Sequence, residues 1–390
     1  MNSATTHYLE CIGCLTRFTP AQNYSCPKCG DLLQIGYDYE SLRDKVHAAV
    51  VKMGALSVWR YKDILPVSPR NAVTLGEGGT GLPRSRRMAE QLGLDEVYFK
   101  NEGQNPTASF KDRGMTVAVT RAIQTGAKTV LCASTGNTSA SMAAYAARAG
   151  LKATVLVPRG KIAAGKLLQA IVHGARIEQV SGNFDQALEK ARAMAATGKL
   201  YLANSLNPYR IEGQKTLAFE VWEQLGKVPD LVIVPVGNAG NISAIWKGFW
   251  ELKKLKVTNS LPRMIGVQAA GAAPIARAYN RGERNVVPWS HPETKATAIR
   301  IGAPASWKKA LTAVRNSNGA MLTVSDSEIL RYQRLLANHE GIFAEPASAA
   351  SAAGLAKAAK HRLLSSREVV VCVITGHGLK DPEGSRKLLA

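Results

Sequence analysis

Residues 105–114, NPTASFKDRG, decide the fold, because they set Lys111 between an aromatic residue and an Asp-Arg-Gly turn. Three loops elsewhere offer complementary groups: STGNTSAS (134–141), VPVGNAGNIS (234–243) and VITGHGLKD (373–381). A lysine, an Asn-bearing loop, a Gly/Asn-rich loop and a threonine after a strand together describe a pocket for a phosphorylated, aldehyde-bearing ring. The set predicts pyridoxal phosphate as cofactor, with the lysine as its Schiff-base partner.

The Gly/Asn-rich loop GNAGN, residues 237–241, follows an apolar run and precedes the helical pattern ISAIWKGFWEL. Glycines let the backbone approach a ligand, and free N–H groups at a helix start suit a phosphate. The loop lacks both the GxGxxG spacing of dinucleotide folds and the Gly-Lys-Ser/Thr ending of nucleotide-triphosphate loops. A small phosphate ester therefore fits it better than a nucleotide, and a tight strand-to-helix turn is the alternative.

The loop 134–141 also joins a predicted strand to a predicted helix. Asn137 can donate to a ring oxygen, and the hydroxyls nearby can hold a substrate carboxylate. The alternative is helix capping by Ser134, Thr135, Asn137 or Thr138. An isolated lysine at a helix start is usually a surface charge. The prediction that Lys111 is catalytic therefore depends on the three other loops, which offer complementary groups for one cofactor. We expect Asp112 and Arg113 to anchor the turn, and Ser109 and Phe110 to fix the approach of the lysine.

From residue 97 onward, apolar strand patterns alternate with helical ones, which indicates parallel sheets covered on both faces by helices. The predicted strands are VYFKNE, TVLCAS, ATVLVP, ARIEQV, LVIVPV, MIGVQA and VVVCVIT. Helical patterns between them include FDQALEKARAMAA, EGQKTLAFEVWEQLG and ASAASAAGLAKAAK. The sequence therefore predicts an α/β protein.

Four of the six cysteines form two Cys-x2-Cys pairs, Cys11/Cys14 and Cys26/Cys29. Two such pairs close together resemble a zinc ribbon, in which four thiolates surround a structural ion and leave no position open for chemistry. The alternative is a relic that keeps the turns without the ion, and a reducing compartment disfavours disulfides. The other two, Cys132 and Cys372, lie in apolar runs and are expected to be buried.

The composition is that of a globular protein, with 46% hydrophobic and 20% charged residues in a chain of 390. The beginning, MNSATTHYLEC, has no secretory-signal pattern, and no apolar run is long enough to span a membrane, so we expect a cytoplasmic enzyme. The net charge of +21 raises the alternative of a nucleic-acid partner. Scattered basic residues without interleaved aromatics favour a solvated surface instead.

Longer motifs carry a resemblance that runs through almost the whole chain. The chain resembles the threonine synthases, which belong to fold type II of the pyridoxal-phosphate enzymes and in many members carry an N-terminal cysteine ribbon. The narrower segments NSLNPYR and ATAIRIG point to this family rather than to its broader relatives. The shared motifs are NPTASFKDRG, STGNTSAS, NSLNPYRIEGQKTLAFE, PVGNAGN, ATAIRIGAPASWKKAL, EGIFAEPASAAS and TGHGLKDP.

The resemblance implies a role for each site residue. Lys111 is the Schiff-base lysine and the catalytic base, Asn137 binds the phenolic oxygen of the ring and Thr375 meets the pyridine nitrogen. The cofactor phosphate is held by Gly237, Asn238, Ala239, Gly240 and Asn241. The substrate carboxylate is held by Ser134, Thr135 and Thr138, and the substrate phosphate by Asn204, Ser205 and Arg210, whose fork suits that group.

The implied reaction converts O-phospho-L-homoserine and water to L-threonine and phosphate by β,γ-elimination and water addition. The implied lyase is cytoplasmic and a homodimer, with a small-molecule substrate and no membrane or nucleic-acid partner. Two alternatives stay open: a related lyase or β-replacing synthase, such as a threonine or serine dehydratase, and a zinc-ribbon protein that binds nucleic acid. Absence of a phosphate clamp would mark the first alternative.

The predicted architecture is a two-domain fold of type II with parallel-rich sheets flanked by helices, preceded by a small cysteine ribbon. We place the ribbon at residues 1–38 and the catalytic region at 39–390, with a smaller α/β subdomain near 115–205 and a larger one from the remainder. Some positions depart from the family pattern and leave room for a shifted substrate: Gly79, Gly81, Ala108 and Ala303.

Overall fold

The computed structural model describes residues 6–21, 24–51, 54–159, 164–182, 184–198 and 200–386. Part of the N-terminal sequence on which the expectation about a secretory signal rests, residues 1–5, lies outside these ranges. The chain forms two compact units, each built from two stretches of sequence. Unit 1 comprises residues 1–79 and 111–216, and unit 2 comprises 80–110 and 217–390.

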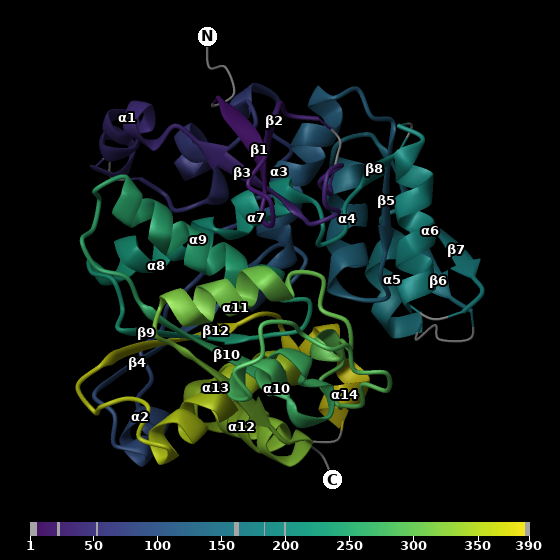
Figure 1. Ribbon diagram of the computed structural model, residues 1–390. Helices are drawn as coiled ribbons and strands as arrows, with labels where there is room; N and C mark the ends of the chain where they lie inside the picture. Colours follow the sequence, from purple (N-terminus) through teal and green to yellow (C-terminus); the bar gives the residue numbers. More distant parts are fainter. Residues whose placement is uncertain are drawn as a thin grey trace. The chain divides into compact units, whose positions relative to one another are not determined.

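Unit 2 is organised around a five-stranded sheet in which every paired neighbour is parallel, in the order β11-β10-β9-β12-β4. Every residue of β9 and β12 is buried, as expected where helices cover both faces of a parallel sheet. Helices α12 and α13 lie on one side of it and α9 and α11 on the other (Figure 1). The strands are β4 (Glu96–Asn101), β9 (Leu231–Pro235), β10 (Arg263–Ala269), β11 (Ala320–Val324) and β12 (Val369–Ile374).

Unit 1 contains a four-stranded parallel sheet in the order β7-β6-β5-β8, with α4 and α6 packed on it. Its core joins apolar side chains of β5 and β6 to the small residues of α4, which let that helix approach the sheet closely. The strands are β5 (Thr129–Ala133), β6 (Lys152–Pro158), β7 (Arg176–Val180) and β8 (Tyr201–Leu202).

The α-helices flank these sheets or connect their strands. Those of unit 1 are α1 (Tyr39–Val51), α3 (Lys111–Gln124), α4 (Asn137–Arg148), α5 (Ala164–Val172), α6 (Phe184–Ala196) and α7 (Pro208–Gln214). Those of unit 2 are α2 (Arg87–Leu92), α9 (Gly240–Lys254), α10 (Pro274–Asn280), α11 (Trp307–Asn316), α12 (Asp326–Glu340), α13 (Pro346–Lys360) and α14 (Pro382–Arg386), together with α8 (Thr216–Leu225), which starts at the unit boundary.

The cysteines near the N-terminus belong to a small antiparallel sheet of unit 1, ordered β2-β1-β3. Its strands are β1 (His7–Cys11), β2 (Arg17–Phe18) and β3 (Leu33–Tyr37). Cys11 faces Leu33 at one end of the β1–β3 pair, and His7 faces Tyr37 at the other. The cysteine pairs and the two aromatic rings therefore occupy opposite ends of one sheet.

The predicted α/β class with parallel sheets is confirmed, and each of the seven predicted strands is present. In the two parallel sheets, β8 and β11 escaped prediction, β8 because it has only two residues and β11 because AMLTV is short and only partly buried. The three strands of the small antiparallel sheet were not predicted either. The predicted helix over EGQKTLAFEVWEQLG is two helices, α7 and α8, which meet at Lys215. The domain boundaries at residue 38 and near residues 115 and 205 stay predictions.

Helices α3 and α7 approach each other closely because glycine stands at both contact points. A Cβ on Gly213 would lie 1.8 Å from the carbonyl oxygen of Arg113, and one on Gly114 would lie 2.7 Å from that of Arg210. Neither backbone can move aside without disturbing its own helix. The two glycines therefore bring the helix that begins at Lys111 against the helix that carries Arg210.

We predict that Gly213→Ala destabilises the enzyme by about 3 kcal/mol, because overpacking against backbone cannot relax through a side chain. Urea unfolding monitored by far-ultraviolet circular dichroism measures the loss. Gly54→Ala is the control, since its new methyl would meet only the flexible guanidinium of Arg60, at 3.2 Å. Equal midpoints for the two variants would show that the α3–α7 contact tolerates a side chain.

Candidate active site

Lys111 is the first residue of α3, and the two residues after it are fully buried and anchor the helix within unit 1. Asp112 accepts a hydrogen bond from the Ser141 hydroxyl of α4 (2.6 Å). Arg113 donates from Nη1 to the Thr216 hydroxyl (3.2 Å). The prediction that these two neighbours anchor the turn is confirmed, and the Ser141 bond fixes the start of α3 against the helix that begins at Asn137.

The approach to Lys111 is held by backbone pairing within unit 2. The Phe110 N–H donates to the Thr375 carbonyl (3.0 Å), and the His377 N–H donates to the Ala108 carbonyl (3.0 Å). Between these bonds, Ser109 pairs with Gly376 in an isolated antiparallel bridge. Residues 108–110 and 375–377 thus form a short two-stranded ribbon that ends one residue before Lys111.

The loop 134–138 leads into α4, whose N-cap residue is Gly136 rather than any of the four polar side chains weighed as caps. The Ser134 hydroxyl accepts from the Gly136 N–H (3.2 Å), which shapes the turn ahead of the helix. Asn137 opens α4 and is nearly buried, whereas Ser134, Thr135 and Thr138 are half-buried. The first N–H groups of α4 therefore need a partner other than a capping side chain, as a carboxylate ligand would provide.

The NSLNPYR segment begins with an asparagine that is tied to the strand before this loop. Asn204 accepts from the Ala133 N–H (2.9 Å) and donates to the Ala133 carbonyl (2.9 Å). Further on, Asn207 is the N-cap of α7 and Pro208 occupies its first turn, a common helix start. Asn204 thus links the segment to the 134–138 loop, and Ser205 stands half-buried between them.

Arg210 lies on α7 with only 2% of its surface exposed. Its Nη1 donates to the Ala203 carbonyl (3.2 Å), while its Nε has no hydrogen-bond partner and no carboxylate of the described ranges pairs with it. Burial lowers the pKa of Arg210 to about 10, which still leaves the guanidinium charged at neutral pH. A buried cation without a counter-charge is costly, so the site is suited to a bound anion.

In unit 2, the loop 237–241 precedes α9 and is tied to the segment that contains ATAIRIGAPAS. Asn238 accepts from the Ala305 N–H at its side chain (3.2 Å) and from the Ser306 N–H at its carbonyl (3.1 Å). Ala239 has a left-handed conformation (φ 66°) and makes no side-chain cap to α9. The side-chain amide of Asn241 is buried, and neither of its polar atoms has a partner among the described residues. A phosphate would accept hydrogen bonds from Nδ2 of this amide and from the first N–H groups of α9.

Thr375 follows β12, is nearly buried and shares a hydrogen bond with the Ser348 hydroxyl (2.8 Å). Ser348 also accepts from the Gly376 N–H (2.8 Å) and lies 3.1 Å from the Gly376 carbonyl. The sequence reasoning missed Ser348 and Ser141. Both serines occur in runs of alanine and serine, a pattern that indicates a helix with small side chains and no particular contact. Their partners, Thr375 for Ser348 and Asp112 for Ser141, could be found only from the tertiary structure.

The predicted site residues form two groups, which belong to different units. Unit 1 contains Lys111, Ser134, Thr135, Asn137, Thr138, Asn204, Ser205 and Arg210. Unit 2 contains Gly237, Asn238, Ala239, Gly240, Asn241 and Thr375. The assignment of each residue to a ligand group stays a prediction.

The glycine-rich loop near residue 77 is held by a buried carboxylate. Glu77 accepts from the Tyr145 hydroxyl (2.6 Å), the Trp59 indole N–H (3.1 Å) and the Leu75 N–H (2.9 Å). Three donors offset the cost of burying its charge. Gly79, one of the departures from the family pattern, fits here because a Cβ would lie 2.4 Å from the Leu56 carbonyl.

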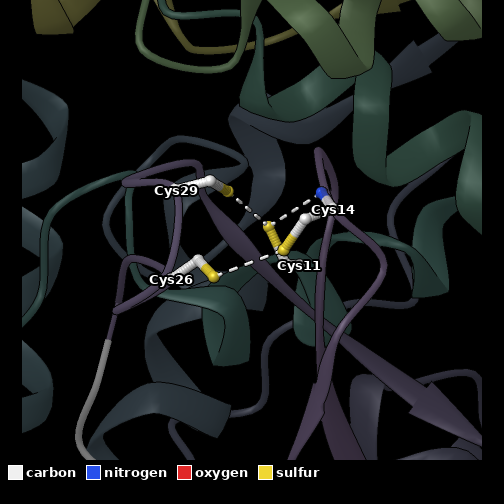
Figure 2. A group of neighbouring side chains, drawn as sticks. All are labelled: Cys11, Cys14, Cys26 and Cys29. Carbon is white, nitrogen blue, oxygen red and sulfur yellow. Dashed lines mark hydrogen bonds between the residues drawn. The ribbon is translucent and has the colours of Figure 1, made fainter.

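The four cysteines of the small sheet converge, as Figure 2 shows, with all four Sγ atoms within 4.8 Å of one another. The Sγ atoms of Cys11 and Cys29 are 3.3 Å apart, and those of Cys14 and Cys26 are 3.6 Å apart. Tetrahedral zinc–thiolate bonds require sulfur separations of about 3.8 Å, close to these values. Backbone N–H groups of Gly13 and Cys14 donate to the Cys11 sulfur at 3.3 and 3.4 Å. Such N–H groups stabilise a thiolate, as a metal site of this type requires. Cys132 and Cys372 are fully buried in strands, as predicted.

Comparison with known proteins identifies the class. The family model of pyridoxal-phosphate-dependent enzymes matches residues 73–376. The α/β fold and the loops before α4 and α9, whose first N–H groups have no capping side chain, agree with this match. The chain therefore belongs to the pyridoxal-phosphate-dependent enzymes.

Within that class, the chain belongs to the threonine synthases, and it is accordingly a lyase of amino-acid biosynthesis. The threonine synthase of Methanocaldococcus jannaschii is 54% identical over 364 residues, covering 93% of this chain and 90% of the relative. That of Methanosarcina acetivorans is 51% identical over 379 residues, 97% and 93% of the two chains. That of Mycobacterium tuberculosis is 56% identical over 329 residues, 84% and 89%.

Solved structures support the fold. The processed form of threonine deaminase isoform 2 from Solanum lycopersicum has a TM-score of 0.70 at 21% identity, covering 90% of this chain and 94% of that one. Maize serine racemase has a TM-score of 0.67 at 20% identity, covering 80% and 91%. Among the described helices, none combines the length and the apolar character needed to cross a membrane.

One residue of the two-stranded pairing between residues 108–110 and 375–377 has an unfavourable backbone conformation. Ala108 has φ 63°, in the left-handed region that costs a residue with a Cβ about 1–2 kcal/mol. We predict that Ala108→Gly raises the free energy of unfolding by about 0.5–1 kcal/mol, because the greater chain entropy of glycine offsets part of the gain. Ala149→Gly, at φ −86°, is the matched control and should lower it. Urea unfolding of both variants measures this, and destabilisation by both would contradict the prediction.

Proposed function

We propose that this enzyme converts O-phospho-L-homoserine and water to L-threonine and phosphate. The observation that carries the proposal is the buried guanidinium of Arg210, which has an unpartnered Nε and no carboxylate partner among the described residues. It lies on the NSLNPYR segment, in the unit that also contains Lys111. A related lyase acting on serine or threonine would have no substrate phosphate for this cation to bind.

In this proposal, the cofactor is held by a lysine, two polar side chains and one loop. Lys111 binds it covalently, Asn137 donates to its phenolic oxygen and Thr375 meets the ring nitrogen. The backbone and the amide of the 237–241 loop hold its phosphate, and the partnerless side chain of Asn241 supports that assignment. Pyridoxal phosphate, when bound, supplies an electron sink for negative charge at the substrate Cα.

The substrate is oriented by its two anionic ends. Its carboxylate is bound by Ser134, Thr135 and Thr138 with the first N–H groups of α4. Its phosphate is bound by Arg210 with Ser205, and Asn204 keeps the segment in register with the carboxylate loop through Ala133. Holding both ends fixes the Cα–H bond in one orientation.

Proton transfer is assigned to the Nζ of Lys111, which accepts the Cα proton once the amine is free. Because Lys111 begins α3, the anchoring of Asp112 by Ser141 limits how far this amine can move. A Cβ proton is then lost as phosphate leaves from Cγ, Cγ takes up a proton, water adds at Cβ and the proton returns to Cα. The Thr375 hydroxyl is neutral and shared with Ser348, which suits a reaction that does not require a permanently protonated ring nitrogen.

We also propose a structural zinc ion bound by Cys11, Cys14, Cys26 and Cys29, a cytoplasmic location and a homodimeric state. The sulfur separations and the N–H groups that face Cys11 support the zinc site. The location rests on the pattern of the sequence, and the oligomeric state rests on family resemblance.

The decisive experiment is phosphate release from O-phospho-L-homoserine by the purified holoenzyme, with L-threonine formed in equal amount. Lys111→Ala should abolish the visible absorbance of the bound cofactor and lower turnover by about 10³-fold or more. Arg210→Ala should keep the absorbance and raise KM by about 100-fold, because it removes a buried charge-assisted contact. Release of a keto acid from serine or threonine without phosphate release from phosphohomoserine would overturn the proposal.

For the cysteine site, we predict one zinc ion per chain by mass spectrometry of enzyme purified without chelator. Cys26→Ser should remove the metal and lower the melting temperature, because structural zinc stabilises small modules directly. Cys132→Ala is the matched control and should keep the zinc. Metal-free native enzyme with four thiols reactive toward a titrant would favour a metal-free relic.

A further inference from the structure

We define the cysteine module as residues 6–21 and 24–38, and the phosphate segment as residues 202–215. We propose that the module positions the phosphate segment. In this proposal, Tyr24 and Tyr37 are positioning residues for Arg210. This inference rests on the proposed function, in which Arg210 binds the substrate phosphate. All of these residues belong to unit 1. The module reaches the phosphate segment at three points.

The first point is a buried triad. The Tyr37 hydroxyl donates to Glu212 Oε2 (2.6 Å), and Lys215 Nζ donates to the same oxygen (2.6 Å). Lys215 Nζ also donates to the Ile64 carbonyl (3.0 Å) and lies 4.5 Å from the centre of the Tyr37 ring. Glu212 and Lys215 are fully buried, so this carboxylate depends on both donors to offset its desolvation.

The second point lies at the other end of the phosphate segment. The Leu202 N–H donates to the Tyr24 hydroxyl (3.1 Å), and the Tyr24 ring stands edge-on to Tyr201 at 6.4 Å. Leu202 is the last residue of β8 and precedes Asn204 by two positions. Tyr24 thus sets the place where the segment leaves the sheet.

The third point is next to Arg210 itself. His7 Nε2 lies 3.1 Å from the Tyr209 hydroxyl, and the two rings are perpendicular at 5.8 Å. On α3, the Arg121 guanidinium stands 5.0 Å from the centre of the Tyr209 ring. Tyr209 is therefore in contact with both the module and the helix that begins at Lys111.

The contact at Glu212 restrains α7 from the side opposite to the Arg210 side chain. Glu212 follows Arg210 by two positions, and residues two apart on a helix project about 200° from each other. Helix α7 has only seven residues and gains little stability from its own hydrogen bonds, so its position depends on what holds it. The Nε of Arg210 has no partner within the described protein and is free to bind the substrate phosphate. A small displacement of α7 would move the guanidinium out of hydrogen-bonding distance of that phosphate.

The module transmits this restraint through its small sheet. His7 and Tyr37 are directly paired on β1 and β3, and the same strand pair ends at Cys11 and Leu33 beside the cysteine site. Loss of the cysteine site would loosen the sheet at the end near Cys11. The contacts of His7 and Tyr37 with α7, at the other end, would then weaken.

The test compares Tyr37→Phe and Tyr24→Phe with Tyr8→Phe in the holoenzyme. Tyr8 lies on β1 in the same module, where its ring packs against the Arg17 guanidinium at 4.3 Å, away from the phosphate segment. The readouts are the dissociation constant of inorganic phosphate, KM and kcat for phosphohomoserine, and amide hydrogen exchange of residues 203–210. We expect Tyr37→Phe to weaken phosphate binding and raise KM by about tenfold, with kcat changed less than twofold and faster exchange in the segment. Tyr24→Phe should act in the same direction, and Tyr8→Phe should change none of these readouts.

Unchanged phosphate binding and KM in both Tyr37→Phe and Tyr24→Phe would overturn the inference, even if the melting temperature fell. A parallel loss of kcat and cofactor absorbance would likewise contradict it, because that pattern marks general unfolding. Phosphate binding and hydrogen exchange do not depend on turnover. A wild-type enzyme that binds phosphate through Arg210 but releases none from phosphohomoserine would therefore refute the proposed function while leaving the positioning role supported.

Discussion

The contact between α3 and α7 sets the geometry on which much of unit 1 depends. Glycine at both crossing points lets two backbones meet where any side chain would keep them apart. One helix begins with Lys111, and the other carries Arg210. The group assigned to proton transfer and the group assigned to phosphate binding are therefore held by one rigid crossing, and hydrogen bonds from Ser141 and Tyr37 brace its two partners from outside.

Buried polar groups in this molecule fall into two kinds, and the difference is informative. Glu77 and Glu212 are each surrounded by donors, so their charges are balanced within the protein. Arg210 and Asn241 are buried with polar atoms that no described residue satisfies. An unsatisfied buried group costs free energy, and a bound anion would offset that cost at the Arg210 guanidinium and at Asn241 Nδ2.

Much of the architecture could be predicted because it follows from local pattern. Fully apolar runs such as LVIVPV identified the buried strands, and the Gly/Asn-rich and Ser/Thr-rich loops after them are those to which the ligands are assigned. The triad of Tyr37, Glu212 and Lys215 could not be predicted, since its members come from distant segments and each alone resembles a surface residue. The short strand β8 and the break between α7 and α8 also depend on tertiary packing rather than on periodicity.

The triad has a consequence for the history of the chain. The Tyr37 hydroxyl donates to Glu212 Oε2, as Lys215 Nζ does, and it comes from the cysteine module. An ancestor that lost the module in one step would have kept the buried Glu212–Lys215 ion pair with one hydrogen bond fewer, at a cost in stability. Selection would therefore oppose loss of the small sheet by itself, without a compensating change at this ion pair.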